Sequence, residues 1–342
     1  MAHYRLALLG FGNVGQALAR LLLQKRAELA ERYDLTYSVT AIATGRHGSA
    51  LDPDGLDLEA ALRLLESGEN LENLSRELVP SDNFDLIRRC QAQVLFENTP
   101  VDHTSGQPAV EHIRQALLAG MEVVTANKGP VVHAYQELSE LAREKGLHFL
   151  FESTVMDGAP IFSLFRECLP AAQLKGFRGV LNSTSNLILT RMENGGSFEE
   201  AVRHAQAIGI AETDPAGDVD GWDAAIKVAA LVTVLMGIPL KPGQVEREGI
   251  RALTAEQVRA ARAEGKRWKL VCSARRKGET VRARVRPEIV ASSSTLYNVE
   301  GTSSLVEFET DVLGCLSIGE TNPGAETTAY GLLADLINAL RK

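Results

Sequence analysis

Cysteine is scarce in this chain. Only four cysteines occur among its 342 residues, at Cys90, Cys168, Cys272 and Cys315. They form no CxxC pair, and none has a histidine at the spacing of a metal site, which argues against a disulfide framework and against a zinc site. We therefore predict four reduced thiols in packed positions of a cytoplasmic protein.

Long basic runs and long apolar runs are also missing. The net charge is -8, and no cluster of Lys and Arg is long enough to follow a phosphate backbone, so we expect no nucleic-acid partner. No apolar run approaches the roughly 20 residues of a membrane span, and the N-terminus shows no signal-peptide pattern, so we expect no membrane partner. A hydrophobic content of 45% and a charged content of 23% are typical of a globular protein, and the length indicates about two domains.

The first recognisable pattern is a strand, a glycine-rich turn and a helix. Residues 4–9 form a short apolar run that is typical of a buried parallel strand. A GxGxxG motif follows and leads into a helix with apolar periodicity, and in this context the motif predicts dinucleotide binding. Gly10 allows a tight turn, Gly12 lets the backbone approach a pyrophosphate, and Gly15 lets helix and strand pack closely. The predicted cofactor-binding residues of this turn are Gly10, Gly12, Asn13, Val14 and Gly15.

The end of the second predicted strand bears on the choice of cofactor. This strand, residues 37–43, is followed by Thr44-Gly45-Arg46-His47. An enzyme that uses NAD usually has an Asp or Glu here, bonded to the ribose. No acid is present, and Arg46 could pair with a 2′-phosphate. We predict NADP slightly in preference to NAD, while use of both, or a mere surface position for Arg46, stays open.

Further patterns complete an α/β unit. Strands are predicted at residues 93–97, 121–125 and 148–151, and helices at residues 109–119 and 131–145. This alternation predicts a Rossmann-type, doubly wound parallel sheet, in which ligands bind at the carboxyl ends of the strands. Thr99 and Lys128 both follow predicted strands. Lys128 is therefore either aimed at the ligand crevice or an ordinary solvated lysine.

Beyond residue 151 the pattern is that of a second, α+β domain. Residues 152–160 form either a connector between domains or a loop that offers carbonyls and one carboxylate to a cation. A strand at 177–181 ends in the polar run 182–186, which either holds a small polar substrate or caps a helix starting at Leu187. We expect the last helix, residues 329–340, to return to the first domain. An antiparallel sheet is predicted from the alternating runs 268–274, 281–285 and 305–310.

An acidic loop that runs into an apolar helix is the most distinctive stretch. It carries five carboxylates and ends at Lys227. Asp223 and Lys227 are four residues apart, so they share one face of a helix. A carboxylate that holds an amine suits acid–base chemistry, but the same spacing is also that of the commonest surface salt bridge. From the residues alone both interpretations stay open. The five carboxylates are Glu212, Asp214, Asp218, Asp220 and Asp223.

Taken together, these motifs resemble homoserine dehydrogenase over nearly the whole chain. The GxGxxG turn is unspecific, whereas the run Val124-Thr-Ala-Asn-Lys128-Gly-Pro is much more specific. The segment from Ala205 to Lys227 is similar to the signature segment of the family, and the run that begins at Gly324 also matches. The resemblance is to the short, stand-alone catalytic form, with no aspartate kinase before it and no regulatory domain after it.

The resemblance implies an enzyme that interconverts L-aspartate 4-semialdehyde and L-homoserine with NAD(P)(H), in the route to threonine and methionine. It implies an NAD(P)-binding Rossmann domain of residues 1–151, joined by the C-terminal helix 325–342. A catalytic and dimerisation domain would span residues 152–324. We expect a homodimer, with an interface near the strands of residues 268–310.

The resemblance also assigns catalytic and cofactor roles. Lys227 would donate a proton to the aldehyde oxygen, Asp223 would hold Lys227, and Lys128 would add positive charge. Thr99 and Lys128 would lie near the nicotinamide, with Gly324 at its rim. This distribution gives hydride addition a cation for the negative charge that develops on oxygen.

Substrate and cation sites follow from the same resemblance. Glu212 would bind the amino group of the substrate, and Asp214, Asp223 and Thr184 would line the polar pocket. Asp218 is expected to shape the loop, and Asp220 to be solvated. A monovalent cation, Na⁺ or K⁺, would be bound by Glu152 and the carbonyls of Val155, Asp157 and Ala159.

The chain departs from the family pattern at three places. Met156-Asp157 stands where the family is usually rich in glycine, which puts the cation site in doubt because a Cβ restricts the backbone. Ser183 and Leu187 stand where Gly and Tyr are common. These two changes favour the nearest alternative, an oxidoreductase of another amino-acid semialdehyde or 2-amino alcohol. A non-catalytic NAD(P)-binding sensor is a further alternative, although a sensor would not need the acids and lysines.

Overall fold

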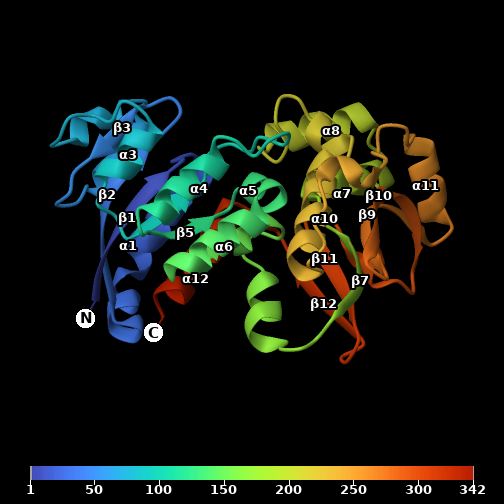
Figure 1. The fold of residues 1–342 in the computed structure, drawn as a ribbon. Helices are drawn as coiled ribbons and strands as arrows, with labels where there is room; N and C mark the ends of the chain where they lie inside the picture. Colours follow the sequence, from blue (N-terminus) through green and yellow to red (C-terminus); the bar gives the residue numbers. More distant parts are fainter. Residues whose placement is uncertain (1, 342) are drawn as a thin grey trace. The chain divides into compact units, whose positions relative to one another are not determined.

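The computed structural model describes residues 2–341, and the chain divides into two compact units (Figure 1). The first unit comprises Met1–Pro160 and Gly324–Lys342, and the second unit comprises Ile161–Pro323. Each unit contains one six-stranded sheet. The predicted fold class, a Rossmann-type α/β unit combined with an α+β unit, is confirmed.

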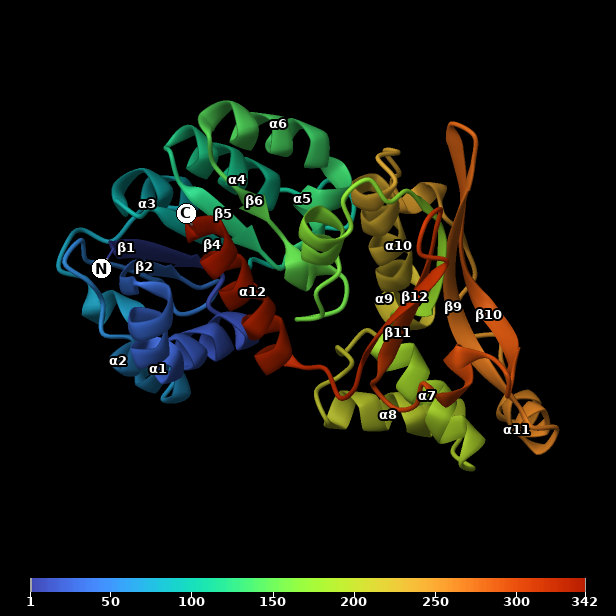
Figure 2. The same cartoon turned by 90° about the horizontal axis from the view of Figure 1, so that it is seen from below.

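The sheet of the first unit is doubly wound. Its strand order is β3-β2-β1-β4-β5-β6, and the strands are parallel except for β3, which is antiparallel to β2. Helices α1 and α12 pack together on one face, and α3, α4 and α6 cover the other (Figure 2). The elements are β1 (Ala2–Leu9), α1 (Asn13–Tyr33), β2 (Leu35–Ala43), β3 (Ser49–Leu51), α2 (Leu58–Glu66), α3 (Asn83–Arg89), β4 (Val94–Glu97), α4 (Ala109–Leu118), β5 (Glu122–Thr125), α5 (Lys128–His133), α6 (Tyr135–Lys145), β6 (Phe149–Leu150) and α12 (Ala325–Leu340).

One predicted helix of the first unit is in fact two. The expected helix at 131–145 begins at Lys128, because the Asn127 side chain caps it, and it is interrupted at Ala134. Ala134 has φ -141°, outside the helical region. Pro130 lies in the first turn of α5, where its missing N–H leaves no intrahelical bond unmade. The short antiparallel strand β3 was not predicted.

The last helix returns to the first unit, as predicted. Apolar side chains of α12, among them Leu332 and Leu336, belong to the same buried core as Leu6 of β1. The Asp335 side chain, almost fully buried, accepts a hydrogen bond from the Glu152 N–H at 2.8 Å. The helix is thereby fixed to the segment that follows β6.

The second unit places helices on one face of its sheet. The strand order is β12-β11-β7-β9-β10-β8, antiparallel except for the short β8, which runs parallel to β10. Helices α7, α10 and α11 contact β9. The elements are β7 (Leu174–Val180), α7 (Ser183–Glu193), α8 (Phe198–Ala207), α9 (Ala216–Val219), α10 (Trp222–Leu235), β8 (Glu246–Arg247), α11 (Ala255–Ala263), β9 (Lys266–Lys277), β10 (Thr280–Ala291), β11 (Ser304–Thr310) and β12 (Cys315–Glu320).

Several predictions for the second unit need correction. The antiparallel sheet is present, but β8 and β12 were not predicted, and β9 and β10 are longer than the apolar runs that indicated them. The added residues include exposed charged side chains such as Arg275 and Arg286, which an apolar pattern does not register. Two of the four cysteines, Cys168 and Cys315, are exposed, so the prediction that all four are packed is wrong.

Within residues 2–341, no helix has the length and apolar character needed to cross a membrane.

The packing of α12 gives a stability prediction. A Cβ added at Gly331 would lie 2.2 Å from Ser153 Oγ and 2.9 Å from the Asp157 carbonyl oxygen. Although alanine normally favours a helix over glycine, we expect Gly331→Ala to destabilise the protein by about 1–3 kcal/mol through overpacking. Gly217→Ala, a helical glycine with open space around it, is the matched control. Equal melting temperatures for both variants would contradict the packing described here.

Candidate active site

The three glycines of the nucleotide turn differ in the space that a side chain would have at each position. Gly10 has φ +93°, and a Cβ there would lie 2.3 Å from backbone atoms of Asn98 at the end of β4. A Cβ at Gly15 would lie 2.6 Å from the Gly10 carbonyl oxygen, whereas Gly12 has open space around it. Gly12 is also the N-cap of α1 and offers no side-chain cap. The N–H groups that begin α1, which include those of Asn13 and Val14, are thus available to an anion such as a pyrophosphate.

The end of β2 lies beside this turn. The Ala43 carbonyl accepts hydrogen bonds from the N–H groups of Gly10 and Phe11, at 3.1 and 3.0 Å. The next residues form a tight turn, in which Thr44 Oγ1 accepts from the His47 N–H at 2.7 Å. Arg46 is at the tip of this turn and is exposed. Its guanidinium is therefore accessible next to the predicted nucleotide site.

Two neighbouring strands carry Thr99 and Lys128 to the same edge of the sheet. Strands β4 and β5 are parallel neighbours, and Asn127 joins the loops that follow them. Asn127 Nδ2 donates to the Thr99 carbonyl at 3.0 Å, while Asn127 Oδ1 accepts from the Gly129 N–H and caps α5. Lys128, the first residue of α5, is half-buried. These residues meet at the carboxyl ends of the strands, where open α/β sheets bind ligands.

In the second unit, Asp223 and Lys227 are an ion pair on α10. Lys227 Nζ lies 3.4 Å from Asp223 Oδ2 and donates to the Leu181 carbonyl at 2.7 Å. The side chains of Lys227 and Asp223 are 14% and 21% exposed. This pair is therefore not the solvated surface salt bridge that the sequence left open. The ammonium is held beside Leu181, the residue that follows β7.

Asn182 links this pair to a second carboxylate. Its Nδ2 donates to Asp218 Oδ1 at 2.6 Å and to Asp223 Oδ2 at 3.0 Å. Its Oδ1 accepts from the Ser185 N–H at 2.8 Å and caps α7. The prediction that this helix starts at Leu187 is therefore wrong: it begins at Ser183, directly after Asn182. A capping asparagine gains enough from the helix N–H groups to start a helix within a polar run.

Asp218 has the most unusual environment of the acidic loop. Burial raises the pKa of its carboxyl above the ordinary value, and the negative charge of Asp223 raises it further. Hydrogen bonds from Asn182 and Thr184 and the charge of Lys227 lower the same pKa. Two carboxylates and one amine are thus grouped in a partly dry site, where electrostatic interactions are stronger than in water. The sequence suggested only a loop-shaping role for Asp218, and it placed Asn182 in a polar run that would hold substrate or cap a helix, without linking it to Asp218.

Two of the remaining predicted substrate residues, Glu212 and Asp214, lie on the loop before α9, whereas Thr184 lies on α7. Glu212 and Asp214 are exposed, and the loop is held by Gln206, whose Nε2 donates to the carbonyls of Glu212 and Thr213 at 3.1 and 3.0 Å. Asp214 Oδ1 accepts from the Ala216 N–H at 3.0 Å. Thr184 is buried, and its hydroxyl donates to the Ile210 carbonyl at 3.3 Å.

Asp220 lies at the surface, as expected, and it also forms an ion pair that the sequence did not predict. Its two carboxylate oxygens accept hydrogen bonds from Arg251 Nε at 2.9 Å and from Arg251 Nη2 at 3.1 Å. Such a two-point ion pair has a defined geometry. Asp220 thus has a structural partner outside the cluster of Asp218, Asp223 and Lys227.

The predicted cation loop contains a left-handed backbone conformation of the kind that glycine usually adopts. Asp157 has φ +43°, a left-handed conformation that Asp and Asn adopt more readily than most residues. The Thr328 hydroxyl donates to its carboxylate, while Glu152 and Val155 are buried. Within residues 2–341, no cluster of three or more His, Cys, Asp or Glu side chains could hold a metal ion. A cation here would therefore depend on main-chain carbonyls, such as those of Val155 and Ala159.

Comparison with known proteins identifies the family. Residues 10–152 match the model of the homoserine dehydrogenase NAD-binding domain, and residues 160–337 match that of homoserine dehydrogenase. An NAD(+)-dependent homoserine dehydrogenase from Pseudomonas canavaninivorans is 35% identical over 99% of this chain and 96% of its own. The homoserine dehydrogenase of Methanocaldococcus jannaschii is 36% identical over 97% of each chain.

Solved structures agree with this family. A hyperthermophilic archaeal homoserine dehydrogenase mutant, solved in complex with NADPH, aligns with a TM-score of 0.83 and 31% identity. The alignment covers 99% of this chain and 98% of that one. With both of its units matched, the chain belongs to the homoserine dehydrogenase family of NAD(P)-dependent oxidoreductases.

Proposed function

We propose that this enzyme interconverts L-aspartate 4-semialdehyde and L-homoserine, and thereby serves threonine and methionine synthesis. The observation that carries the proposal is the Lys227 ammonium, held by Asp223 and the Leu181 carbonyl in a half-buried position. The first unit supplies the nucleotide turn with its open Gly12 position. This turn fits a pyrophosphate, so a nicotinamide dinucleotide would supply the hydride.

The proposed mechanism uses one proton donor, Lys227, and two fixed charges, those of Asp223 and Lys128. As the carbonyl carbon gains a hydride, its oxygen becomes an alkoxide and takes a proton from Lys227. Asp223 orients Lys227 through their ion pair. Lys128 adds positive charge near the nicotinamide, next to Thr99 and with Gly324 at the rim. Charge that is already in place needs no reorganisation during the reaction, which is why such groups lower the barrier.

We propose that Glu212 binds the amino group of the substrate, and that Asp223 and Thr184 line the polar pocket. Two aspartates remain candidates for the same pocket. Asp218 shares Asn182 with Asp223, whereas Asp214 is exposed and bonded to the loop backbone. This geometry favours Asp218 over Asp214 as the further carboxylate.

The cofactor is NADP in preference to NAD in this proposal. Arg46 is exposed at the tip of the turn after β2, next to the nucleotide turn, and an arginine suits a 2′-phosphate. The relatives include both a protein named as NAD(+)-dependent and one solved with NADPH. The family therefore accommodates both cofactors, and the choice rests on Arg46.

A monovalent cation, Na⁺ or K⁺, is part of the proposal. The buried Glu152 and the carbonyls of Val155, Asp157 and Ala159 would hold it. The left-handed backbone of Asp157 supports this, because the residue adopts the conformation that a glycine would otherwise supply. The non-glycine residues Met156 and Asp157 are therefore compatible with the loop.

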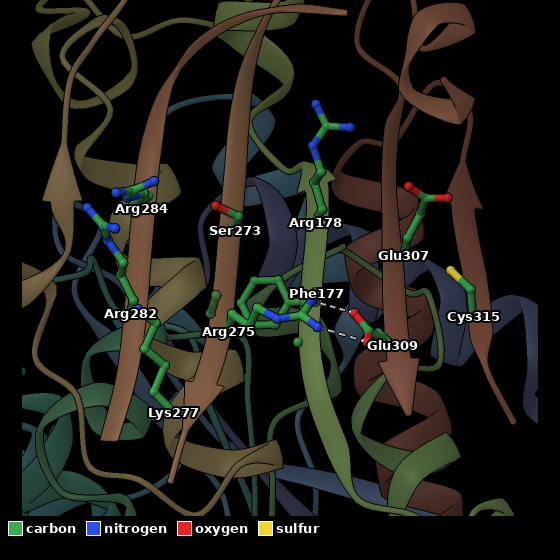
Figure 3. Close-up of a pocket in the computed structure, with 12 residues that line it drawn as sticks. Phe177, Arg178, Ser273, Arg275, Lys277, Arg282, Arg284, Glu307, Glu309 and Cys315 are labelled. Carbon is green, nitrogen blue, oxygen red and sulfur yellow. Dashed lines mark hydrogen bonds and ion pairs between the residues drawn. The ribbon is translucent and has the colours of Figure 1, made fainter. Parts of the chain in front are cut away.

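We further propose a homodimer in the cytoplasm, formed through the sheet of the second unit. The face away from α10 carries rows of polar side chains across its strands, such as Glu307, Arg178 and Ser273 in register (Figure 3). Arg275 and Glu309 form a two-point ion pair on this face, at 2.6 and 3.1 Å. A self-complementary face needs both signs of charge, which these rows provide.

The test of the proposed function is oxidation of L-homoserine by NADP, followed by absorbance of NADPH. Turnover with homoserine and a much lower kcat/KM with other 2-amino alcohols supports the proposal. Preference for another alcohol would favour the related oxidoreductase, to which Ser183 and Leu187 on the first turns of α7 would then adapt the pocket. Binding of NADPH without turnover of any of these alcohols would indicate a sensor.

Removal of the amine should affect chemistry more than binding. We expect Lys227→Ala to lower kcat by about 10²–10⁴-fold, the usual contribution of a positioned acid, with a much smaller change in KM for homoserine. Lys266→Ala removes an exposed lysine on β9 and is the matched control. A kcat near that of the wild type in Lys227→Ala would refute the assignment.

The two candidate aspartates can be told apart by steady-state kinetics. Asp218→Asn should raise KM for homoserine about 10–100-fold, because a lost hydrogen bond between charged groups is worth that much. Asp214→Asn should change KM by less than about threefold, as expected for an exposed residue. The reverse order would show that Asp214, and not Asp218, contacts the substrate.

Arg46 should control the choice of cofactor. We expect Arg46→Ala to lower kcat/KM for NADP about tenfold, through loss of an arginine–phosphate contact, and to leave kcat/KM for NAD nearly unchanged. The measurement is the ratio of the two kcat/KM values in wild type and variant. An unchanged ratio means that Arg46 does not read the 2′-phosphate.

A further inference from the structure

A completely buried carboxylate lies beneath the nucleotide edge of the first unit. Glu97, the last residue of β4, has no exposed surface. Carboxylates are almost never fully buried unless they are paired or hydrogen-bonded. The proposed mechanism gives Glu97 no part, so its burial needs another explanation.

The carboxylate of Glu97 is an acceptor for the residues at two strand ends. Its Oε1 accepts from the Thr99 hydroxyl and, at 3.4 Å, from the Thr99 N–H. Its Oε2 lies 3.5 Å from the hydroxyl of Thr125, which donates to the Glu97 carbonyl at 2.6 Å. Thr125 is the last residue of β5. The Glu97 side chain thus holds Thr99, and the Glu97 main-chain carbonyl holds Thr125 at the end of β5.

A histidine completes this buried cluster. His112 of α4 is 1% exposed, and its Nδ1 lies 3.4 Å from Glu97 Oε1. Its other nitrogen lies 3.5 Å from Asn83 Nδ2, and its ring contacts Phe84 at 5.1 Å between centroids. The two ring nitrogens of His112 thus contact the Glu97 carboxylate on one side and the Asn83 amide on the other.

The residues fixed by Glu97 stand at the nucleotide turn. The Thr99 nitrogen is 2.6 Å from the position of a Cβ at Gly10, so the two loops are in close contact. Thr125 Oγ1 accepts from the Asn127 N–H at 2.9 Å, and Asn127 Nδ2 in turn binds the Thr99 carbonyl. A closed ring of hydrogen bonds therefore joins Glu97, Thr99, Asn127 and Thr125, directly before Lys128.

We propose that Glu97 is a positioning residue for hydride transfer, which fixes Thr99 and the turn before Lys128 against the nicotinamide site. The proposal rests on the roles given above to Thr99 and Lys128. A carboxylate suits this position because it accepts several hydrogen bonds and donates none when ionised. Without it, the N–H and hydroxyl of Thr99 lose their buried acceptor, and the loop relaxes to find another. A displacement of about 1 Å at such a loop is enough to lower the rate substantially.

The test compares Glu97→Ala and Glu97→Gln with the control Thr40→Val. Thr40 is a buried residue of β2 whose hydroxyl donates to the Cys90 carbonyl at 2.6 Å, so the control also loses a buried hydrogen bond. We expect Glu97→Ala to lower kcat about 10–100-fold and to enlarge the primary isotope effect with deuterated homoserine. Homoserine KM should change by less than about threefold. Glu97→Gln keeps one acceptor oxygen and should recover most of the lost rate.

The control separates positioning from stability. Thr40→Val should lower the melting temperature and leave kcat and the isotope effect unchanged. If the Glu97 variants only lower the melting temperature, as Thr40→Val does, Glu97 is structural and the proposal is wrong. In a Thr99→Val background, Glu97→Ala should have a much smaller effect on kcat than it has alone. Additive effects would show that Glu97 does not act through Thr99.

Failure of the proposed function would be visible separately. If the wild-type protein binds NADPH and does not oxidise homoserine, the proposed dehydrogenase function is refuted. The Glu97 proposal can still be tested, by measuring NADPH binding. NADPH fluorescence should then report a dissociation constant about tenfold higher for Glu97→Ala, because the contact between Glu97 and the Thr99 loop is lost. The Thr40→Val value should equal that of the wild type. Equal values for all three proteins would overturn the proposal.

Discussion

An ammonium group that is largely removed from water needs fixed acceptors around it, or its charge is lost. In the second unit, Lys227 obtains them from Asp223 and from the Leu181 carbonyl at the end of β7. The rest of the site depends on this arrangement. Asn182 follows Leu181 directly, caps α7 with its side-chain oxygen, and uses its amide group to hold Asp218 and Asp223 together.

The first unit uses the same device. Asn127 caps α5 with its side-chain oxygen, and its amide group binds the Thr99 carbonyl on the neighbouring loop. In both units an asparagine two residues after the end of a strand therefore does two things: it starts a helix and it fixes polar groups beside that strand. Both asparagines are buried, so their hydrogen bonds are shielded from competing water.

The sequence predicted what short-range patterns determine. The GxGxxG turn and the spacing of Asp223 and Lys227 indicated a nucleotide turn and an ion pair, because glycine spacing and helical periodicity act locally. The start of α7 could not be read in the same way, since its polar first turn looks like a loop until Asn182 is recognised as the cap. The proximity of Asp218 to Asp223 and the burial of Glu97 against Thr99 result from tertiary packing. No periodic pattern in the sequence indicates them.

We propose that Lys227 is placed to meet the reacting oxygen. A crystal structure of the protein with NADP⁺ and L-homoserine tests it most directly. We expect Lys227 Nζ within about 3 Å of the substrate hydroxyl oxygen, which is a hydrogen-bond distance. The contact of Lys227 with the Leu181 carbonyl either remains or is replaced by the contact with the substrate. If the homoserine hydroxyl is bound to another side chain and Lys227 is out of reach, the proposed role of Lys227 as the proton donor is contradicted.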